Sequence, residues 1–209
     1  MGTGVDLRRN RGKLMKKQFI PQQMRPALQF ALAAGIALFQ IYLMVIAGFM
    51  EQFGKSPYSF TIQGIITNLL LVSSSLLGAE LSRAWLLNRV LRRPSALLPV
   101  SLALLYTFIG LPLNRLPTID STLEQTTQFL GSSFLPGFME NLMASFLAMW
   151  GGALPALVYR GIIQAFSWFC PVLPDLTWVM KALTGTIVPM VGMALVHEFI
   201  SLKQSQGKA

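Results

Sequence analysis

Four charged residues in otherwise apolar stretches are the side chains of this sequence best placed to do chemistry. Glu80 and Arg83 lie three residues apart in the run TNLLLVSSSLLGAELSRAWLLNRVLRR, where helical spacing puts them on one face. Glu140 and Arg160 occur in later apolar runs. Because a charge inside a membrane is costly, these groups are expected to form a polar core that fixes how the helices pack. The alternative is that they carry intramembrane catalysis or transport.

Metal and cofactor chemistry is poorly supported by the residues present. Cys170 is the only cysteine and His197 the only histidine. One thiol makes neither an intrachain disulfide nor a thiolate metal site, and one imidazole cannot build a histidine cluster. The sequence also lacks a GxxxxGK phosphate loop and a Gly-x-Ser-x-Gly nucleophile elbow. No metal and no cofactor are expected.

The composition is that of a polytopic membrane protein. The chain is 53% hydrophobic and only 12% charged, with a mean hydropathy of +0.55, whereas soluble domains average about a quarter charged residues. Seven of the 17 Lys and Arg residues fall between Arg8 and Arg25, and four between Arg83 and Arg93. Such clustering marks cytoplasmic segments, so the net charge of +9 indicates contact with anionic lipids rather than nucleic acid.

The apolar runs predict an all-α transmembrane bundle, located in the cell membrane and surrounded by the lipid bilayer. A basic cytoplasmic segment (1–25) precedes a helical domain (26–203), and a short tail (204–209) follows. Five spans are expected, with a short surface helix over Leu123–Leu130 and an interfacial amphipathic stretch over Tyr159–Pro174. The spans are Ala27–Met50, Phe60–Trp85, Ser95–Leu113, Gly137–Val158 and Leu176–Leu202.

Five spans put the N-terminus in the cytoplasm and the C-terminus outside. If the stretch around Arg160 crosses instead, six segments bring both ends to the cytoplasmic side. Asp175 is expected to cap the N-terminus of the last span, and Lys181 to reach back to the cytoplasmic surface. The favoured interpretation of Glu140 is a cap near the start of the fourth span.

Five segments resemble the polytopic membrane region that precedes the catalytic domain in long-form type I signal peptidases. The resemblance implies a serine peptidase domain outside the membrane, as a continuation of the chain or as a separate subunit. This chain would then be a non-catalytic module that anchors or assists the cleavage of signal peptides. The segments are Phe53–Ser59, Gly78–Arg83, Leu130–Asn141, Gly152–Gln164 and Pro171–Trp178.

The same resemblance suggests Ser133 as a weak candidate for a catalytic residue. The signal peptidase nucleophile lies in a Ser-Met-x-Pro setting with a desolvated Lys as its base. Ser133-Phe134-Leu135-Pro136 has the Ser-x-x-Pro spacing but lacks the Met. Because Lys181 is expected on the opposite side of the membrane, Ser133 is interpreted as a loop or helix-capping residue.

A second resemblance is to intramembrane proteases of the abortive-infection type, which use a Glu-Glu-x-x-x-Arg motif with further His residues. Ala79-Glu80-Leu81-Ser82-Arg83 has a single Glu, and its Arg is one residue too close. The required histidines are missing from the sequence. A standalone intramembrane protease-like enzyme or a small transporter therefore remains the alternative function.

Overall fold

The computed structural model describes residues 26–90, 97–111 and 122–206. These residues form an almost entirely helical chain with one small antiparallel sheet, which confirms the all-α class. The basic segment 1–25, the basic residues following α3 and most of the expected loop before Leu123 lie outside the described residues. The elements are α2 (Pro26–Met50), β1 (Phe53–Lys55), α3 (Ile62–Val90), α4 (Leu97–Gly110), α5 (Leu123–Phe129), a π-helical segment (Leu130–Phe134), α6 (Leu135–Gly151), α7 (Ala153–Phe169), β2 (Val172–Pro174) and α8 (Trp178–Gln206).

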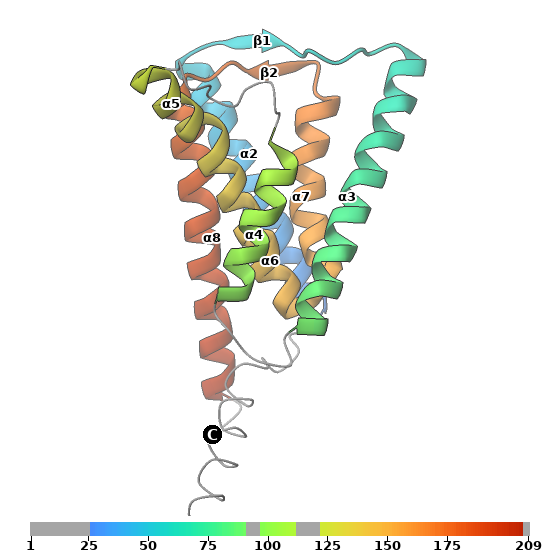
Figure 1. The fold of residues 1–209 in the computed structure, drawn as a ribbon, viewed down its shortest axis with the longest axis vertical. Coiled ribbons are helices and arrows are strands. Elements are labelled where there is room, and N and C mark those ends of the chain that lie inside the picture. The colour runs from blue at the N-terminus through green and yellow to red at the C-terminus, as the bar shows by residue number, and fades with distance from the viewer. Residues whose placement is uncertain (1–25, 91–96, 112–121, 207–209) are drawn as a thin grey trace, which may run out of the picture.

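The long helices run alternately up and down a single bundle (Figure 1). Helices α2, α4 and α7 run toward the end that carries β1 and β2, and α3, α6 and α8 run away from it. We call this end the strand end, and the opposite end, where α2 begins and α8 finishes, the terminal end. The first described helix therefore begins, and the last described helix ends, at the same end of the bundle.

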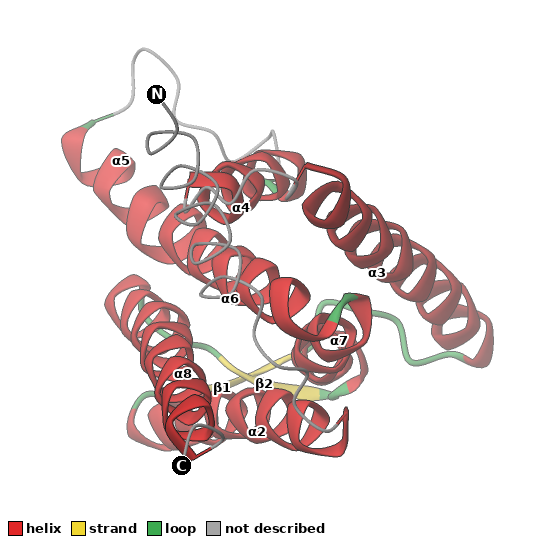
Figure 2. Ribbon diagram, turned by 90° about the horizontal axis from the view of Figure 1, so that it is seen from below, coloured by secondary structure: helices red, strands yellow, loops and turns green. Residues whose placement is uncertain are grey.

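Helix α6 is the centre of the bundle and contacts α3, α4, α7 and α8 (Figure 2). Helix α2 closes the far side by packing against α7 and α8. Small and aliphatic side chains fill the space between these helices, which permits close approach of the backbones. The most buried apolar residues include Ala33, Ala37, Met143, Ala144 and Ala156.

Three helices are long and apolar enough to cross a membrane, namely Pro26–Met50, Ile62–Arg89 and Trp178–Leu202. Helix α4 is apolar but only 14 residues long. Many large apolar side chains lie exposed on the outer faces of the described helices, as expected of surfaces that contact lipid. These features are compatible with a membrane protein, but a bundle of five spans is not confirmed.

The chain differs from the prediction most clearly around Gly152. The fourth span was expected to run through Val158, yet α6 ends at Gly151 and α7 starts at Ala153. Gly152 has a φ of +73°, a left-handed backbone conformation that suits glycine and lets the chain reverse. The expected interfacial stretch is therefore largely α7, which packs lengthwise against α2, α3 and α6.

The short surface helix before the fourth span is present as α5. Thr122 is its N-cap, because its hydroxyl accepts from the main-chain N–H of Gln125 while the Gln125 side chain accepts from the Thr122 N–H. The backbone stays right-handed helical through Leu130 and Leu135, so α5, the π-helical segment and α6 form one continuous path. A π-helical segment inside such a path is a local widening of the helix.

Two three-residue strands join the loops at the strand end, a feature that the sequence did not predict. Phe53 lies opposite Pro174 and Lys55 opposite Val172. Thr177, not Asp175 as predicted, caps α8, since its hydroxyl accepts from the N–H of Met180. Asp175 instead donates its main-chain N–H to Gln52, extending the sheet.

Candidate functional site

Glu80 and Arg83 of α3 form the centre of a buried polar network, and both side chains have no exposed surface. Their i, i+3 spacing brings Arg83 Nε to 3.1 Å from Glu80 Oε2. The two atoms are too poorly aligned to form a hydrogen bond, and neither has another hydrogen-bond partner among the described residues. The contact is thus a charge pair within one helix, which leaves the rest of the guanidinium free to bind elsewhere.

Helix α6 supplies the acceptors for Arg83. The Nη1 atom donates to the Asn141 main-chain oxygen at 2.6 Å and to Ser145 Oγ at 2.9 Å. The Nη2 atom donates to Asn141 Oδ1 at 2.7 Å. From α4, the ring of Tyr106 lies 4.4 Å from the guanidinium carbon, within cation–π range. One side chain therefore joins α3, α4 and α6.

Arg160 of α7 binds the other oxygen of the same carboxylate. Its Nη1 atom lies 3.0 Å from Glu80 Oε1, and its side chain is only 18% exposed. Glu80 thus sits between two guanidinium groups, which offset the cost of burying a carboxylate. Arg160 was expected in an interfacial helix, but the chain reversal at Gly152 places it on a helix inside the bundle.

The network continues into α4 through side-chain amides and hydroxyls. Asn141 Nδ2 donates to Thr107 Oγ1 at 3.2 Å and to the Gly137 main-chain oxygen at 2.9 Å. The hydroxyls of Ser82 and Tyr106 lie 2.6 Å apart. As a result, each of α3, α4, α6 and α7 contributes at least one polar side chain to the network.

Glu140 belongs to a second polar cluster, between α2, α6 and α7. Gln40 Nε2 donates to Glu140 Oε1 at 3.2 Å, and the Tyr159 hydroxyl donates to Gln40 Oε1 at 2.9 Å. Gln40 and Tyr159 are almost fully buried. Glu140 lies in the second turn of α6, so its predicted capping role is wrong, and it links α6 to α2 instead.

The candidate nucleophile and base are not assembled into a dyad. Ser133 lies in the π-helical segment, where its hydroxyl oxygen is 3.4 Å from Ser132 Oγ. Lys181 lies near the start of α8, at the strand end and not at the end where α2 begins, which reverses the predicted orientation of that helix. This brings Lys181 to the same end of the bundle as Ser133, but no hydrogen bond joins the two side chains in the described part of the chain.

The charged side chains of the network are held by one another and by acceptor atoms of α6. Glu80, Arg83 and Arg160 carry formal charges of −1, +1 and +1, and the described bonds hold all three side chains in place. Ser145 Oγ is engaged as well, accepting from Arg83 and donating to the Asn141 main-chain oxygen. Within the residues that the structure describes, no group of three or more His, Cys, Asp or Glu could hold a metal ion.

Several members of the two clusters were missed from the sequence because uncharged polar residues in an apolar helix are easily taken for incidental. The sequence did contain a signal for them: Gln40 is one of only two amides in the first apolar run, and Asn141 and Ser145 have i, i+4 spacing. Comparisons with protein-family models, curated proteins and solved structures give no match to this chain. The function is therefore argued from the geometry and the sequence.

Proposed function

We propose that this chain is a non-catalytic, multi-pass membrane module that anchors or assists a signal-peptidase-I-like enzyme at its strand end. The observation that carries the non-catalytic part is the double pairing of Glu80 with Arg83 and Arg160. A carboxylate held between two guanidinium groups is fixed in position through both of its oxygens. A residue set that joins four helices is well suited to fix their register.

In this proposal the six long helices each cross the bilayer, and the terminal end faces the cytoplasm. The support is the alternating direction of the helices together with the basic clusters expected near the start of α2 and the end of α3. The end of α8 then also faces the cytoplasm. A peptidase partner would consequently meet the module at the strand end, rather than by continuing outward from α8 as first expected.

The link to signal peptidases rests on the five segments that carry the resemblance, which converge on two places in the fold. Phe53–Ser59 and Pro171–Trp178 contain the two strands. Gly78–Arg83, Leu130–Asn141 and Gly152–Gln164 contain the charged residues of the two polar clusters. The resembling segments therefore include the two polar clusters inside the bundle and the strands at the strand end. A module that positions a partner needs both a rigid interior and a surface for contact.

The test is a reconstituted cleavage assay. Proteoliposomes would contain the soluble catalytic domain of a type I signal peptidase and a precursor with a signal peptide, with or without this chain. The expected result is faster cleavage when the chain is present, and equal stimulation by a folded Glu80→Gln variant. Absence of stimulation overturns the peptidase role, and turnover by the chain alone that Glu80→Gln abolishes overturns the non-catalytic role.

The second candidate is a self-contained intramembrane carrier or enzyme, and Glu140 is the observation that favours it. Its carboxylate receives one hydrogen bond from the described residues, from Gln40, and forms no ion pair there. Such a group inside a helix bundle is a default candidate for proton or substrate handling. Loss of transport or turnover in a stably folded Glu140→Gln variant would favour this function.

A further inference from the structure

The two strands at the strand end differ in how accessible the main-chain groups on their outer edges are. In an antiparallel pair, successive residues alternate between bonding to the partner strand and pointing away from it. Ser56 donates its main-chain N–H to Pro171, and Gln52 accepts from Asp175. With the register that pairs Gly54 with Leu173, every second residue of β1 therefore bonds to β2. The main-chain groups of Phe53 and Lys55 point away from it.

The outer edge of β2 is closed. Pro174 has no N–H to offer, and its Cβ atom would come within 2.9 Å of a Cβ added at Gly48 of α2. The main-chain oxygen of Val172 already accepts from Cys170 Sγ at 3.1 Å. Proline and close packing against a helix are means by which proteins block sheet edges. A short strand and an outward Lys, both of which β1 has, also discourage pairing, but they leave the main-chain groups accessible.

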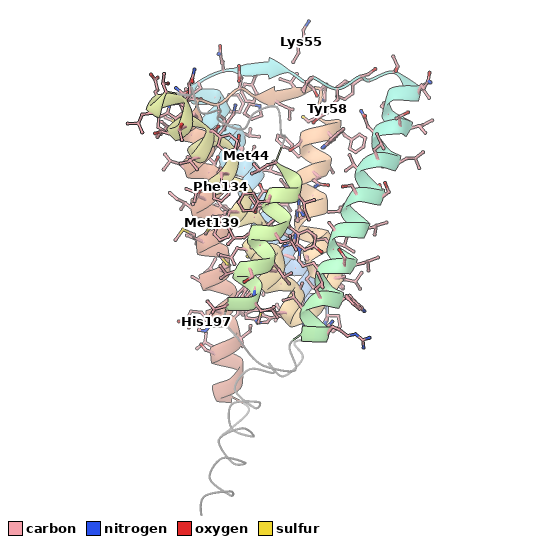
Figure 3. The ribbon with its side chains drawn as sticks, in the orientation of Figure 1. Met44, Lys55, Tyr58, Phe134, Met139 and His197 are labelled. Atoms are coloured by element: carbon pink, nitrogen blue, oxygen red, sulfur yellow. The ribbon has the colours of Figure 1, made fainter. Side chains whose placement is uncertain are left out.

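Among the described residues, the outer edge of β1 has neither a proline nor a side-chain bond to its main-chain oxygens. The ring of Phe53 packs beside Gly48 of α2, as Pro174 does, but this contact does not occupy the main-chain groups of Phe53. Phe53 and Lys55 present two N–H donors and two C=O acceptors, and β1 lies on the side of the sheet that faces away from the bundle (Figure 1). The Lys55 side chain points outward, as Figure 3 shows, and forms no ion pair with a described residue. An edge of this kind matches the backbone of an extended polypeptide and not a helix, a lipid or a small molecule.

The edge is also held in a fixed position, which lowers the cost of ordering it on binding. The Glu51 carboxylate accepts from the Thr177 N–H at 2.6 Å and from its hydroxyl at 2.7 Å, tying the start of β1 to α8. Beyond β1, the ring of Tyr58 stacks on Trp168 of α7 with centroids 4.0 Å apart. Both ends of the strand are thus anchored to neighbouring helices.

We propose that the outer edge of β1 binds an extended segment of another polypeptide as a third strand, with Lys55 favouring a segment that carries an acidic residue. The site is independent of the peptidase proposal, because it depends only on the register of the sheet and the blocked edge of β2. A strand of three residues makes few hydrogen bonds, so the interaction is expected to be weak and reversible.

The test uses the full chain in nanodiscs and a fluorescent capped peptide, Thr-Val-Glu-Val-Thr, with its N-methylated counterpart and empty nanodiscs as controls. Lys55→Pro removes an outward N–H and leaves the bonds between β1 and β2 in place. Val172→Pro makes the same change on the blocked edge. Lys55→Thr removes the charge but keeps the main-chain donor, and the melting temperature of each variant shows whether it is folded.

Wild type and Val172→Pro are expected to bind the peptide equally, whereas Lys55→Pro weakens binding about tenfold, the ratio for a hydrogen bond worth about 1.4 kcal/mol. Lys55→Thr is expected to lose less than Lys55→Pro. Equal losses in the two Lys55 variants would show that only the ammonium group binds and would overturn the proposal. Equal binding of the N-methylated peptide, or no binding by the wild type, would overturn it as well.

Discussion

Arg83 is the residue on which the interior of this bundle most depends. Its guanidinium contacts a carboxylate on its own helix, three acceptor atoms on α6 and an aromatic ring on α4. Lysine would keep the charge but lacks the planar fork that reaches Asn141 and Ser145 together. The position is therefore expected to be intolerant of both charge loss and shape change.

Arg83→Met is expected to destabilise the folded protein by about 3 kcal/mol, because it leaves Asn141 and one side of Glu80 without their buried partner. Unfolding of the purified protein by a denaturing detergent would measure the change. Arg89→Met is the matched control, since among the described residues Arg89 stacks on Trp85 near the end of α3, and this substitution should cost about 0.5 kcal/mol. Equal stability of the two variants would contradict the central role of Arg83.

Tyr159→Phe tests the second polar cluster. Removing the hydroxyl leaves Gln40 Oε1 buried without its donor, which should cost about 1 kcal/mol in the same unfolding measurement. Tyr42→Phe, on the same helix as Gln40 but 58% exposed, should be neutral. A neutral Tyr159→Phe would mean that the hydroxyl contributes nothing to the packing of α7 on α2.

The sequence was sufficient to identify the charged residues of the interior, but not most of the residues that they contact. The cost of burying charge was enough to single out Glu80 and Arg83, and their spacing was enough to pair them. That Arg160 completes the pair depends on α7 packing against α3, a contact between distant segments that local sequence does not specify. The link from Glu140 to Gln40 joins residues 100 positions apart, so it too required the fold.

Among the elements, α8 depends on glycine where it crosses its neighbours. A Cβ atom added at Gly185 would lie 2.5 Å from the Pro136 Cβ of α6, and one added at Gly192 would lie 2.8 Å from Ile36 of α2. Contacts this short force the helices apart. Close packing through small residues is the usual means of helix association in membranes.

Gly185→Ala is accordingly expected to destabilise the protein by about 1–3 kcal/mol, the usual cost of overpacking. Gly35→Ala makes the same change in α2 where no atom lies within 4 Å, and should be neutral or stabilising by up to about 1 kcal/mol. Thermal unfolding of the two variants would compare them directly. A Gly185→Ala variant as stable as Gly35→Ala would show that α8 shifts freely on α6.

The elements also show which sequence signals were sufficient. Long apolar runs located α2, α3 and most of α8, and the short helix expected over Leu123–Leu130 corresponds to α5 and the residue after it. The pair α6 and α7 was missed because each has only 17 residues, shorter than a standard span. Gly151, Gly152 and Pro155 all fall inside the predicted fourth span, although together they mark the reversal.

For the whole molecule, the direction of the helices predicts the location of both ends. In a Cys170→Ser background, Lys55→Cys should react with a membrane-impermeant maleimide in intact cells, and His197→Cys, toward the terminal end in Figure 3, only after permeabilisation. A reporter fused after Ala209 should be active in the cytoplasm. An external signal from that reporter would restore the five-span arrangement and contradict the proposed six crossings.

If α3 crosses the bilayer as proposed, the local pairing of Glu80 with Arg83 has a consequence for how this helix is inserted during synthesis. Helix α3 leaves the ribosome well before Asn141 and Arg160 are made, so for a time its buried charges have no partner on another helix. Because the two lie one turn apart on the same helix, each is already neutralised by the other when α3 is inserted. Arg160 arrives only with α7, and it joins a carboxylate that is already in place. In this arrangement α7 completes the interior by adding Arg160 to a pair that α3 already contains.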